Sequence, residues 1–363
     1  MNLFPRENLE KMAAALLNKA GLKPEDAARG AGVLIQSDLS GVDSHGLSRL
    51  PMYLGRIGQG VVNTDPQVKV LSESAASMVV DCDNGLGIAT VPKVLDMALA
   101  KARESGVLAC TMRHSNHYGV GNYYALKAIE NNMICLLCTN TTPCMAPTGG
   151  VELLIGTNPV TIGVPGGREL PVILDMASTN VAMGKLQAMF REKKKIPFGW
   201  AITKEGLPTD DPAAAVEGSL LPIAGYKGYG LAVIVDMLAA LLSGAEFGPG
   251  VGRLDRAENL KPEGIGHFLL LMEVERFLPL DEFKNRVDAY VQLIKNSRRA
   301  EGVEEIFLPG EIEMKKMAAR KREGIGVTEA LGRQILELAL KMGLAGPGDD
   351  FAALVNKSAG KEA

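Results

Sequence analysis

Cysteine, tryptophan and histidine are scarce in this chain of 363 residues, which has five cysteines, one tryptophan and four histidines. The number of cysteines is odd, and Cys110, Cys135 and Cys138 lie inside apolar runs. That usage is typical of reduced core cysteines and argues against a disulfide framework. We therefore expect a cytoplasmic protein.

No excess of one charge is present, because 39 basic residues stand against 42 acidic ones and leave a net charge of −3. Nucleic acids and anionic membrane surfaces select strongly basic proteins. We therefore expect no nucleic-acid partner and no membrane partner. A small molecule is the favoured ligand.

A membrane-spanning segment is also missing from the sequence. The longest apolar run, residues 231–245, is interrupted by Asp236. It is shorter than the roughly 18 residues that a membrane span needs. We expect this run to form a buried helix.

Hydrophobic periodicity predicts helices at both ends of the chain and a sheet between them. Residues 6–37 show two amphipathic helical patterns, and the chain is helical again from about residue 281. Between about residues 67 and 175, short runs rich in β-branched residues alternate with helical patterns. This pattern predicts a mixed α/β fold in which a helical domain, residues 1–66 plus 300–363, encloses a sheet domain of residues 67–299.

The glycine fingerprint of doubly wound dinucleotide-binding folds is absent. That fingerprint is Gly-x-Gly-x-x-Gly between a strand and a helix, where the pyrophosphate approaches bare backbone. The nearest candidates begin at Gly119, Gly225 and Gly248: the first and the last lack the third glycine, and the one at Gly225 has its middle glycine, Gly228, one place late. No phosphate-binding Gly-x-x-x-x-Gly-Lys-[Ser/Thr] loop is present either.

Three of the four histidines, His45, His114 and His117, lie in polar segments flanked by glycine. Histidine can exchange a proton at neutral pH, as the reduction of a carbonyl group requires. From the residues alone, each could equally cap or fill a turn. His267, at the start of an apolar run, is expected to be structural.

A cation that could hold a substrate carboxylate lies close to His45. Arg49 follows it by four residues, and the arginine fork matches a carboxylate in two hydrogen bonds. If residues 44–54 open as a turn and become helical, Ser44, His45 and Arg49 project to one side, with Tyr53 one turn further. We interpret these residues as a unit that joins a proton donor to a carboxylate anchor.

A metal centre is the alternative use of the histidines. His114 and His117 could begin a zinc site, but no His-Glu-x-x-His motif and no nearby carboxylate completes it. We therefore predict no metal, and keep a metal-dependent hydrolase or lyase using His114 and His117 as the alternative. Cys135 and Cys138 are expected on opposite faces of a strand.

Two further segments could hold a cofactor. Asp175 ends a strand-like run and is followed by small residues that allow close approach to the backbone. Lys227 lies beside glycines just before the long apolar run, where a cation and a helix N-terminus could bind a phosphate. A helix cap and a plain turn are the structural alternatives.

Seven segments, in order, resemble the signature segments of the malate/L-lactate dehydrogenase type II family. The resemblance runs from about residue 6 to residue 330. Members of that family include malate, L-sulfolactate, ureidoglycolate and 2,3-diketogulonate oxidoreductases and reductases of cyclic imino acids. The segments are VDSHGLSRLPMYLGRI (42–57), RHSNHYGVGNYYALKA (113–128), MAPTGGVELLIGTNP (145–159), LDMASTNVAMGK (174–185), IPFGWAITKEGLPTDDP (196–212), GYKGYGLA (225–232) and LPGEIE (308–313).

This resemblance implies a fold like that of L-sulfolactate dehydrogenase, with no doubly wound sheet. NAD or NADP would be held by a mostly antiparallel sheet domain inserted between the N- and C-terminal helices, and homodimers would share the active-site cleft. His117, with a slight preference, or His45 would exchange the proton, Ser44 would support it, and Arg49, with Tyr53 nearby, would bind the substrate. The cofactor-binding residues implied by the family are Thr141, Asp175, Met176, Ala177, Lys227, Gly228, Pro309, Gly310 and Glu311.

The reaction implied is hydride transfer between nicotinamide C4 and carbon 2 of a small 2-hydroxy or 2-oxo acid such as malate, lactate or sulfolactate. The sequence does not distinguish NAD from NADP, because the residue at the ribose 2′ position is not identified. The acid itself and the physiological direction are also left open.

Overall fold

The computed structural model describes residues 2–254 and 260–360, which form a mixed α/β fold around a sheet of seven strands. The strand order is β2-β3-β4-β10-β5-β6-β7. Strands β3 and β4 are parallel and every other neighbouring pair is antiparallel. The strands of this sheet are β2 (Lys69–Glu73), β3 (Ser77–Asp81), β4 (Val107–Ser115), β5 (Met133–Thr139), β6 (Val160–Val164), β7 (Val172–Met176) and β10 (Ile265–Glu273).

The expectation of a mostly antiparallel sheet is therefore confirmed, and each apolar run predicted as a strand forms one. Two small sheets accompany it, one pairing β1 (Asn2–Phe4) with β11 (Ile325–Val327), the other β8 (Ala201–Ile202) with β9 (Ser219–Leu220).

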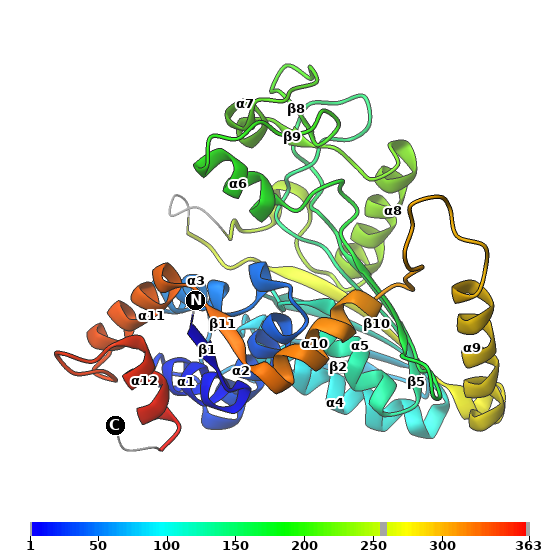
Figure 1. The fold of residues 1–363 in the computed structure, drawn as a ribbon, viewed down its shortest axis with the longest axis horizontal. Helices are drawn as coiled ribbons and strands as arrows, with labels where there is room; N and C mark the ends of the chain where they lie inside the picture. The colour runs from blue at the N-terminus through cyan, green and yellow to red at the C-terminus, as the bar shows by residue number, and fades with distance from the viewer. Residues whose placement is uncertain (1, 255–259, 361–363) are drawn as a thin grey trace.

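Helices cover both faces of the main sheet (Figure 1). On one face α4 and α5 pack their apolar stripes on β3, β4, β10 and β5, and on the other α8 packs near Cys138 and Val160. The helices are α1 (Arg6–Lys19), α2 (Pro24–Leu39), α3 (Leu50–Gly58), α4 (Gly87–Ser105), α5 (Gly121–Glu130), α6 (Met183–Arg191), α7 (Pro212–Glu217), α8 (Tyr226–Asp236), α9 (Leu280–Lys295), α10 (Glu311–Glu323), α11 (Glu329–Lys341) and α12 (Phe351–Ser358), with the short turns η1 (Asp43–His45), η2 (Leu47–Arg49), η3 (Met237–Leu241), η4 (Gly248–Gly250) and η5 (Val274–Arg276).

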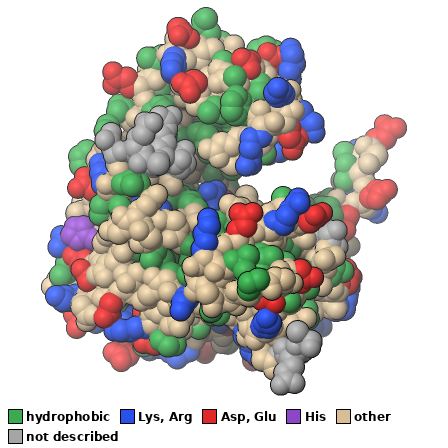
Figure 2. All heavy atoms as spheres, turned by 90° about the vertical axis from the view of Figure 1, so that its left-hand side faces the viewer, with side chains coloured by type: hydrophobic (Ala, Val, Ile, Leu, Met, Phe, Trp, Pro, Cys, Tyr) green, Lys and Arg blue, Asp and Glu red, His purple; other side chains and the backbone are tan. Residues whose placement is uncertain are grey.

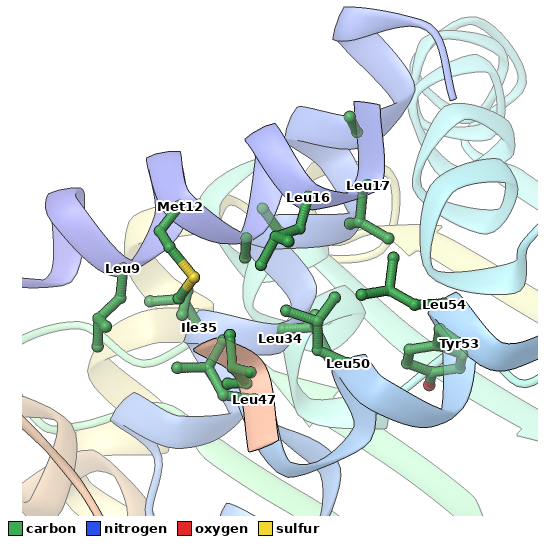
Figure 3. Close-up of a cluster of buried hydrophobic side chains, with 14 of the residues drawn as sticks. Leu9, Met12, Leu16, Leu17, Leu34, Ile35, Leu47, Leu50, Tyr53 and Leu54 are labelled. Atoms are coloured by element: carbon green, nitrogen blue, oxygen red, sulfur yellow. The ribbon is translucent and has the colours of Figure 1, made fainter. Parts of the chain in front are cut away.

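The two ends of the chain meet at one side of the sheet, as Figure 1 shows. Strand β1 pairs with β11 in antiparallel register, and helices α1, α2, α3, α11 and α12 enclose a shared apolar cluster. Figure 3 shows its centre, where leucines of α1, α2 and α3 pack together and the ring of Tyr53 lies at one edge. This cluster also takes in Ile88 of α4, so the division into a helical domain and a sheet domain stays a prediction.

A separate lobe carries α6, α7, β8 and β9 and has its own small apolar cluster around Leu186 and Ile196 (Figure 1). Figure 2 shows the molecule hollowed between this lobe and the body that contains the terminal helices.

The prediction for residues 231–245 is wrong in one respect. The segment is helical, in α8 and η3, but it is not buried throughout. Its small residues Ala232, Ala239 and Ala240 pack inward, whereas larger apolar side chains face outward. The outer face of the segment is therefore apolar, as its inner face is. The outward-facing side chains are Leu231, Ile234, Met237, Leu241 and Leu242, each exposed by 37% or more.

Other predictions about single residues are confirmed. All five cysteines are buried, as expected of core cysteines. Cys135 packs on the α4 and α5 side of β5, whereas Cys138 packs against Val235 on the opposite side. His267 is fully buried in β10, where its ring bonds Thr139 and Ser115. No helix in the part of the chain that the structure describes is long and apolar enough to cross a membrane.

Candidate active site

The turn between α2 and α3 carries Ser44, His45 and Arg49, and its shape is set by Asp38. The Oδ2 atom of Asp38 accepts the backbone N–H of Leu47 at 2.8 Å. A Cβ atom at Gly46 would lie 1.8 Å from Oδ1 of Asp38, so only glycine fits there. The predicted opening of this segment as a turn followed by a helix is confirmed by η1, η2 and α3.

Hydrogen bonds join Ser44, His45 and Arg49, as the spacing predicted. The Ser44 hydroxyl lies 2.9 Å from Nδ1 of His45, and the Arg49 Nε donates to the Ser44 carbonyl at 2.7 Å. The outer end of Arg49 reaches toward the other lobe, because a Cβ atom at Gly184 of α6 would lie 3.8 Å from Nη2. Arg49 therefore lies at the cleft between lobe and body.

His117 follows the end of β4 and stacks on His45. The two ring centroids are 5.6 Å apart, with 27° between the planes. The Nδ1 atom of His117 lies 2.6 Å from the Tyr53 hydroxyl and 3.3 Å from the backbone N of Gly119. Because an amide can only donate, Nδ1 is an acceptor, and in the neutral ring the proton lies on Nε2.

Both histidines are neutral at pH 7 in these surroundings. Burial lowers the pKa of His45 to about 4, and the charge of Arg49 lowers it further. Burial likewise holds the pKa of His117 well below its usual value, with His45 and Arg49 adding to the effect. Each ring is nevertheless partly exposed. A bound carboxylate that neutralises Arg49 would make protonation of these rings easier.

Tyr53 is only 1% exposed, so its ring belongs to the helical core. In Figure 3 its hydroxyl points away from the neighbouring leucines. The Tyr53 hydroxyl is hydrogen-bonded to His117, and the buried ring has no surface open to a substrate. Tyr53 therefore contacts His117 from the side of the helical core, and the substrate contact expected of it stays a prediction.

His114 has a different environment from His117. It is exposed, its backbone has φ of +48°, and its Nδ1 lies 2.9 Å from a carboxylate oxygen of Asp81, which Arg113 also contacts. The two histidines thus have separate partners and do not share a ligand site. Among the described residues no group of three or more His, Cys, Asp or Glu side chains could hold a metal ion.

Two buried charged residues near His117, Glu263 and Arg56, could not be recognised as site residues from the sequence. The Oε2 atom of Glu263 accepts the backbone N–H of His117 at 2.8 Å, and Glu263 is 3% exposed. Arg56, 4% exposed, donates to the carbonyls of Arg253 and Lys261. Only the pairing of β10 with β4 brings Glu263 to His117, since 146 residues separate them in the chain.

Asp175 links the candidate cofactor residues to the His117 turn. Its Oδ1 accepts the Thr161 hydroxyl and its Oδ2 accepts the backbone N–H of Asn122, both at 2.8 Å. Asn122 lies in the first turn of α5, where a negative charge is favourable. Burial raises the pKa of Asp175, and these two hydrogen bonds oppose the rise.

A chain of hydrogen bonds joins the other candidate cofactor segments. The Thr141 hydroxyl accepts the N–H of Thr157, and the Thr157 carbonyl accepts the N–H of Ser178, directly after Met176 and Ala177. The Ser178 carbonyl accepts the N–H of Ile223, whose own carbonyl accepts the N–H of Gly228. These segments therefore meet at the ends of β5, β6 and β7.

The segment with Pro309, Gly310 and Glu311 lies beside β7. The Pro309 carbonyl accepts the N–H of Ile173, two residues before Asp175. The Glu311 carboxylate is already occupied, because it pairs with Lys295 and Lys315, which help to lower its pKa to about 2 against the effect of burial. The Glu311 carboxylate is therefore engaged within this chain.

The residues present fit a dinucleotide. Lys227 is exposed, makes no ion pair with a described residue, and lies in the first turn of α8, which has no side-chain cap. A free cation at an uncapped helix N-terminus suits a pyrophosphate. The buried Oδ1 of Asn122, beside Asp175, has no hydrogen-bond partner among the described residues and could accept one from a ligand.

Comparison with known proteins places this geometry in context. The chain is 40% identical over 338 residues to L-sulfolactate dehydrogenase of Methanocaldococcus jannaschii, covering 93% of this chain and 96% of that protein. The solved structure of sulfolactate dehydrogenase from the same organism matches with a TM-score of 0.87 at 39% identity, over 94% of this chain and 98% of the other.

Two more distant relatives are named with their cofactors. The (2R)-3-sulfolactate dehydrogenase (NADP(+)) of Chromohalobacter salexigens is 33% identical, over 87% of this chain and 91% of that protein. The ureidoglycolate dehydrogenase (NAD(+)) of Escherichia coli K12 is 30% identical, over 92% and 95%. The family model described as malate/L-lactate dehydrogenase matches residues 4–336. The resemblance found in the sequence is thus confirmed, and the chain belongs to the malate/L-lactate dehydrogenase family.

Proposed function

We propose that this protein is an NAD(P)-dependent oxidoreductase that transfers a hydride between a nicotinamide cofactor and a small 2-hydroxy or 2-oxo acid. One observation carries the proposal: His45 and His117 stack at 5.6 Å beside Arg49, at the cleft between the two lobes. The relatives named above act on acids of this kind. No observation favours a metal-dependent hydrolase or lyase at His114 and His117.

We assign each residue of the site a role from its contacts. Arg49 binds the substrate carboxylate, because its guanidinium lies at the cleft with Nε fixed on the Ser44 carbonyl. His117 exchanges the proton of the substrate oxygen, held by Tyr53 on Nδ1 so that Nε2 is the reacting atom. His45, fixed by Ser44, polarises or orients that oxygen. A bound nicotinamide supplies or takes the hydride at C4.

The cofactor is either NAD or NADP, since one relative carries NADP(+) in its name and another carries NAD(+). We assign its binding to the joined segments at the ends of β5, β6 and β7. Lys227 and Gly228 would hold phosphate, and Thr141 and Asp175 would offer polar groups. The remaining positions are Met176, Ala177, Pro309, Gly310 and Glu311, of which the last contributes only its backbone.

A homodimer is part of the proposal. The outward face of α8 and η3, defined above by Leu231, Ile234, Met237, Leu241 and Leu242, is a contiguous apolar surface on one helix. Such patches on soluble enzymes mark subunit contacts. We propose that a second copy of this chain covers it, and that the protein works in the cytoplasm, where its five buried cysteines stay reduced.

The test is an absorbance assay of reduced nicotinamide. NADH and NADPH are offered separately with pyruvate, oxaloacetate, sulfopyruvate, 2,3-diketogulonate, oxalurate and a cyclic imino acid. We expect one cofactor to be consumed with one acid, and no effect of a chelator. If none of these acids consumes either cofactor, and calorimetry detects no cofactor binding, the proposal fails.

A further inference from the structure

Glu263 is a buried carboxyl group that the proposed reaction does not use. It lies just before β10, which pairs with β4 so that Ile265 is opposite Ser115. The same antiparallel register places residue 263 opposite residue 117, beyond the last pair of the ladder. There the backbone N–H of His117 has no carbonyl partner among the described residues and donates to the Glu263 carboxyl at 2.8 Å.

Charged and titratable groups face Glu263 from three segments. Arg56 and Tyr53 come from α3, Arg49 from η2, and His117 from the turn after β4. Burial raises the pKa of Glu263 to about 7, although the His117 N–H, Arg56 and Arg49 all act to lower it. Both charge states of this group are therefore populated near neutral pH, while the two histidines stay neutral.

We propose that Glu263 is a positioning residue for His117, and that it holds the His117 turn more tightly when it is ionised than when it is protonated. The inference rests on the proposed function of His117. A hydrogen bond to a carboxylate is shorter and about twice as strong as one to a neutral acceptor. A rise in pH through neutrality thus tightens the turn that carries the reacting imidazole.

A consequence distinguishes this role from simple packing. A change of activity near neutral pH would ordinarily be attributed to a histidine. Here burial shifts the pKa of His45 to about 4 and that of His117 well below its usual value. Two carboxyl groups of this site therefore titrate near neutrality, Glu263 at the His117 amide and Asp38 at the Leu47 amide. The part of the titration that belongs to Glu263 should disappear when only the charge of that residue is removed.

The experiment follows the backbone amide of His117 by NMR in protein labelled with ¹⁵N-histidine, in which only four amide signals are present because the chain has four histidines. In the unaltered protein we expect the His117 signal to shift with pH near neutrality. In Glu263→Gln the acceptor oxygen remains but cannot ionise, so that shift should vanish. Asp288→Asn is the matched control, because Asp288 is also buried and accepts backbone N–H groups, from Gly167, Arg168 and Glu169.

Turnover gives the second readout. We expect Glu263→Gln to reduce the pH dependence of kcat near neutrality to the part that Asp38 causes, and Glu263→Ala, which also loses the acceptor, to lower kcat by about tenfold to a hundredfold. A His117 amide that titrates in Glu263→Gln as it does in the unaltered protein overturns the inference, as does an unchanged kcat in Glu263→Ala. Failure of the unaltered protein to turn over any acid would count against the proposed function, while the NMR titration would still decide the role of Glu263.

Discussion

At the scale of single residues, the site combines local contacts within the turn that carries His45 and Arg49 with a tertiary contact between His45 and His117. His45 and Arg49 were linked correctly because their contacts are local, within one turn and the start of α3. His117 was a candidate from its polar setting, but its stacking on His45 depends on the packing of β4 beside the turn between α2 and α3. Glu263 gave no signal, because a lone glutamate before a strand has no local pattern.

Asp38 gives a pH-dependent prediction at this scale. Burial raises its pKa to about 7, although the N–H of Leu47 opposes the rise. Because the folded pKa exceeds the ordinary value of 3.8, the folded state keeps its proton where the unfolded state has lost it. The free energy of unfolding therefore falls as pH rises from about 4 to about 7, by at most about 1.4 kcal/mol per pH unit.

Asp38→Asn keeps an oxygen for the Leu47 N–H and removes this titration. We expect its melting temperature, relative to that of the unaltered protein, to increase as pH rises from about 4 to about 7 and to level off above. Thermal denaturation at several pH values measures the difference. A difference that decreases with pH, or stays constant, would show that Asp38 is not a buried group of raised pKa.

Helix α5 is the element that joins the two parts of the site, since the His117 turn enters it and Asp175 receives its first-turn N–H. Its approach to the sheet depends on Gly121. A Cβ atom there would lie 1.8 Å from the Thr161 hydroxyl and 3.0 Å from Oδ1 of Asp175. The periodicity predicted this helix, but the closeness of its N-terminus to β6 and β7 comes from tertiary packing.

Gly121→Ala should therefore move α5 and destabilise the protein by about 1 to 3 kcal/mol. Gly55→Ala is the matched control, because Gly55 also lies in a helix and nothing lies within 4 Å of the position of its added Cβ. It should stabilise by about 0.5 to 1 kcal/mol. Urea denaturation of both variants measures the two effects, and equal effects of the same sign would contradict the tight approach of α5.

At the scale of the whole molecule, the sequence predicted strands β3 to β7 because each contains a short apolar run, whereas β2, with every residue exposed, gave no such pattern. The sequence could not predict which helix faces are covered. The sequence of α8 predicts a buried helix. In the described chain its outer face is exposed, and Ile234 is 51% exposed. A segment that binds a second copy and a segment buried in its own chain have the same composition.

The proposed dimer makes a prediction about this face. Ile234→Asp should convert the protein from a dimer to a monomer, because a charge would be buried without a partner in the interface. Leu340→Asp is the control, since Leu340 is also an exposed apolar side chain, 40% exposed, on α11 at the side where the chain ends meet. Light scattering coupled to size exclusion measures the mass. A dimeric Ile234→Asp variant would exclude this face as the contact.

The central claim, that His117 serves hydride transfer to carbon 2 of a small acid, is tested most directly with a reduced cofactor deuterated at nicotinamide C4. In the unaltered protein, mass spectrometry should find deuterium at carbon 2 of the hydroxy acid product. In His117→Ala the transfer should be slower by about 10²- to 10⁴-fold with cofactor binding retained. Product without deuterium at carbon 2, or a variant as fast as the unaltered protein, would contradict the account.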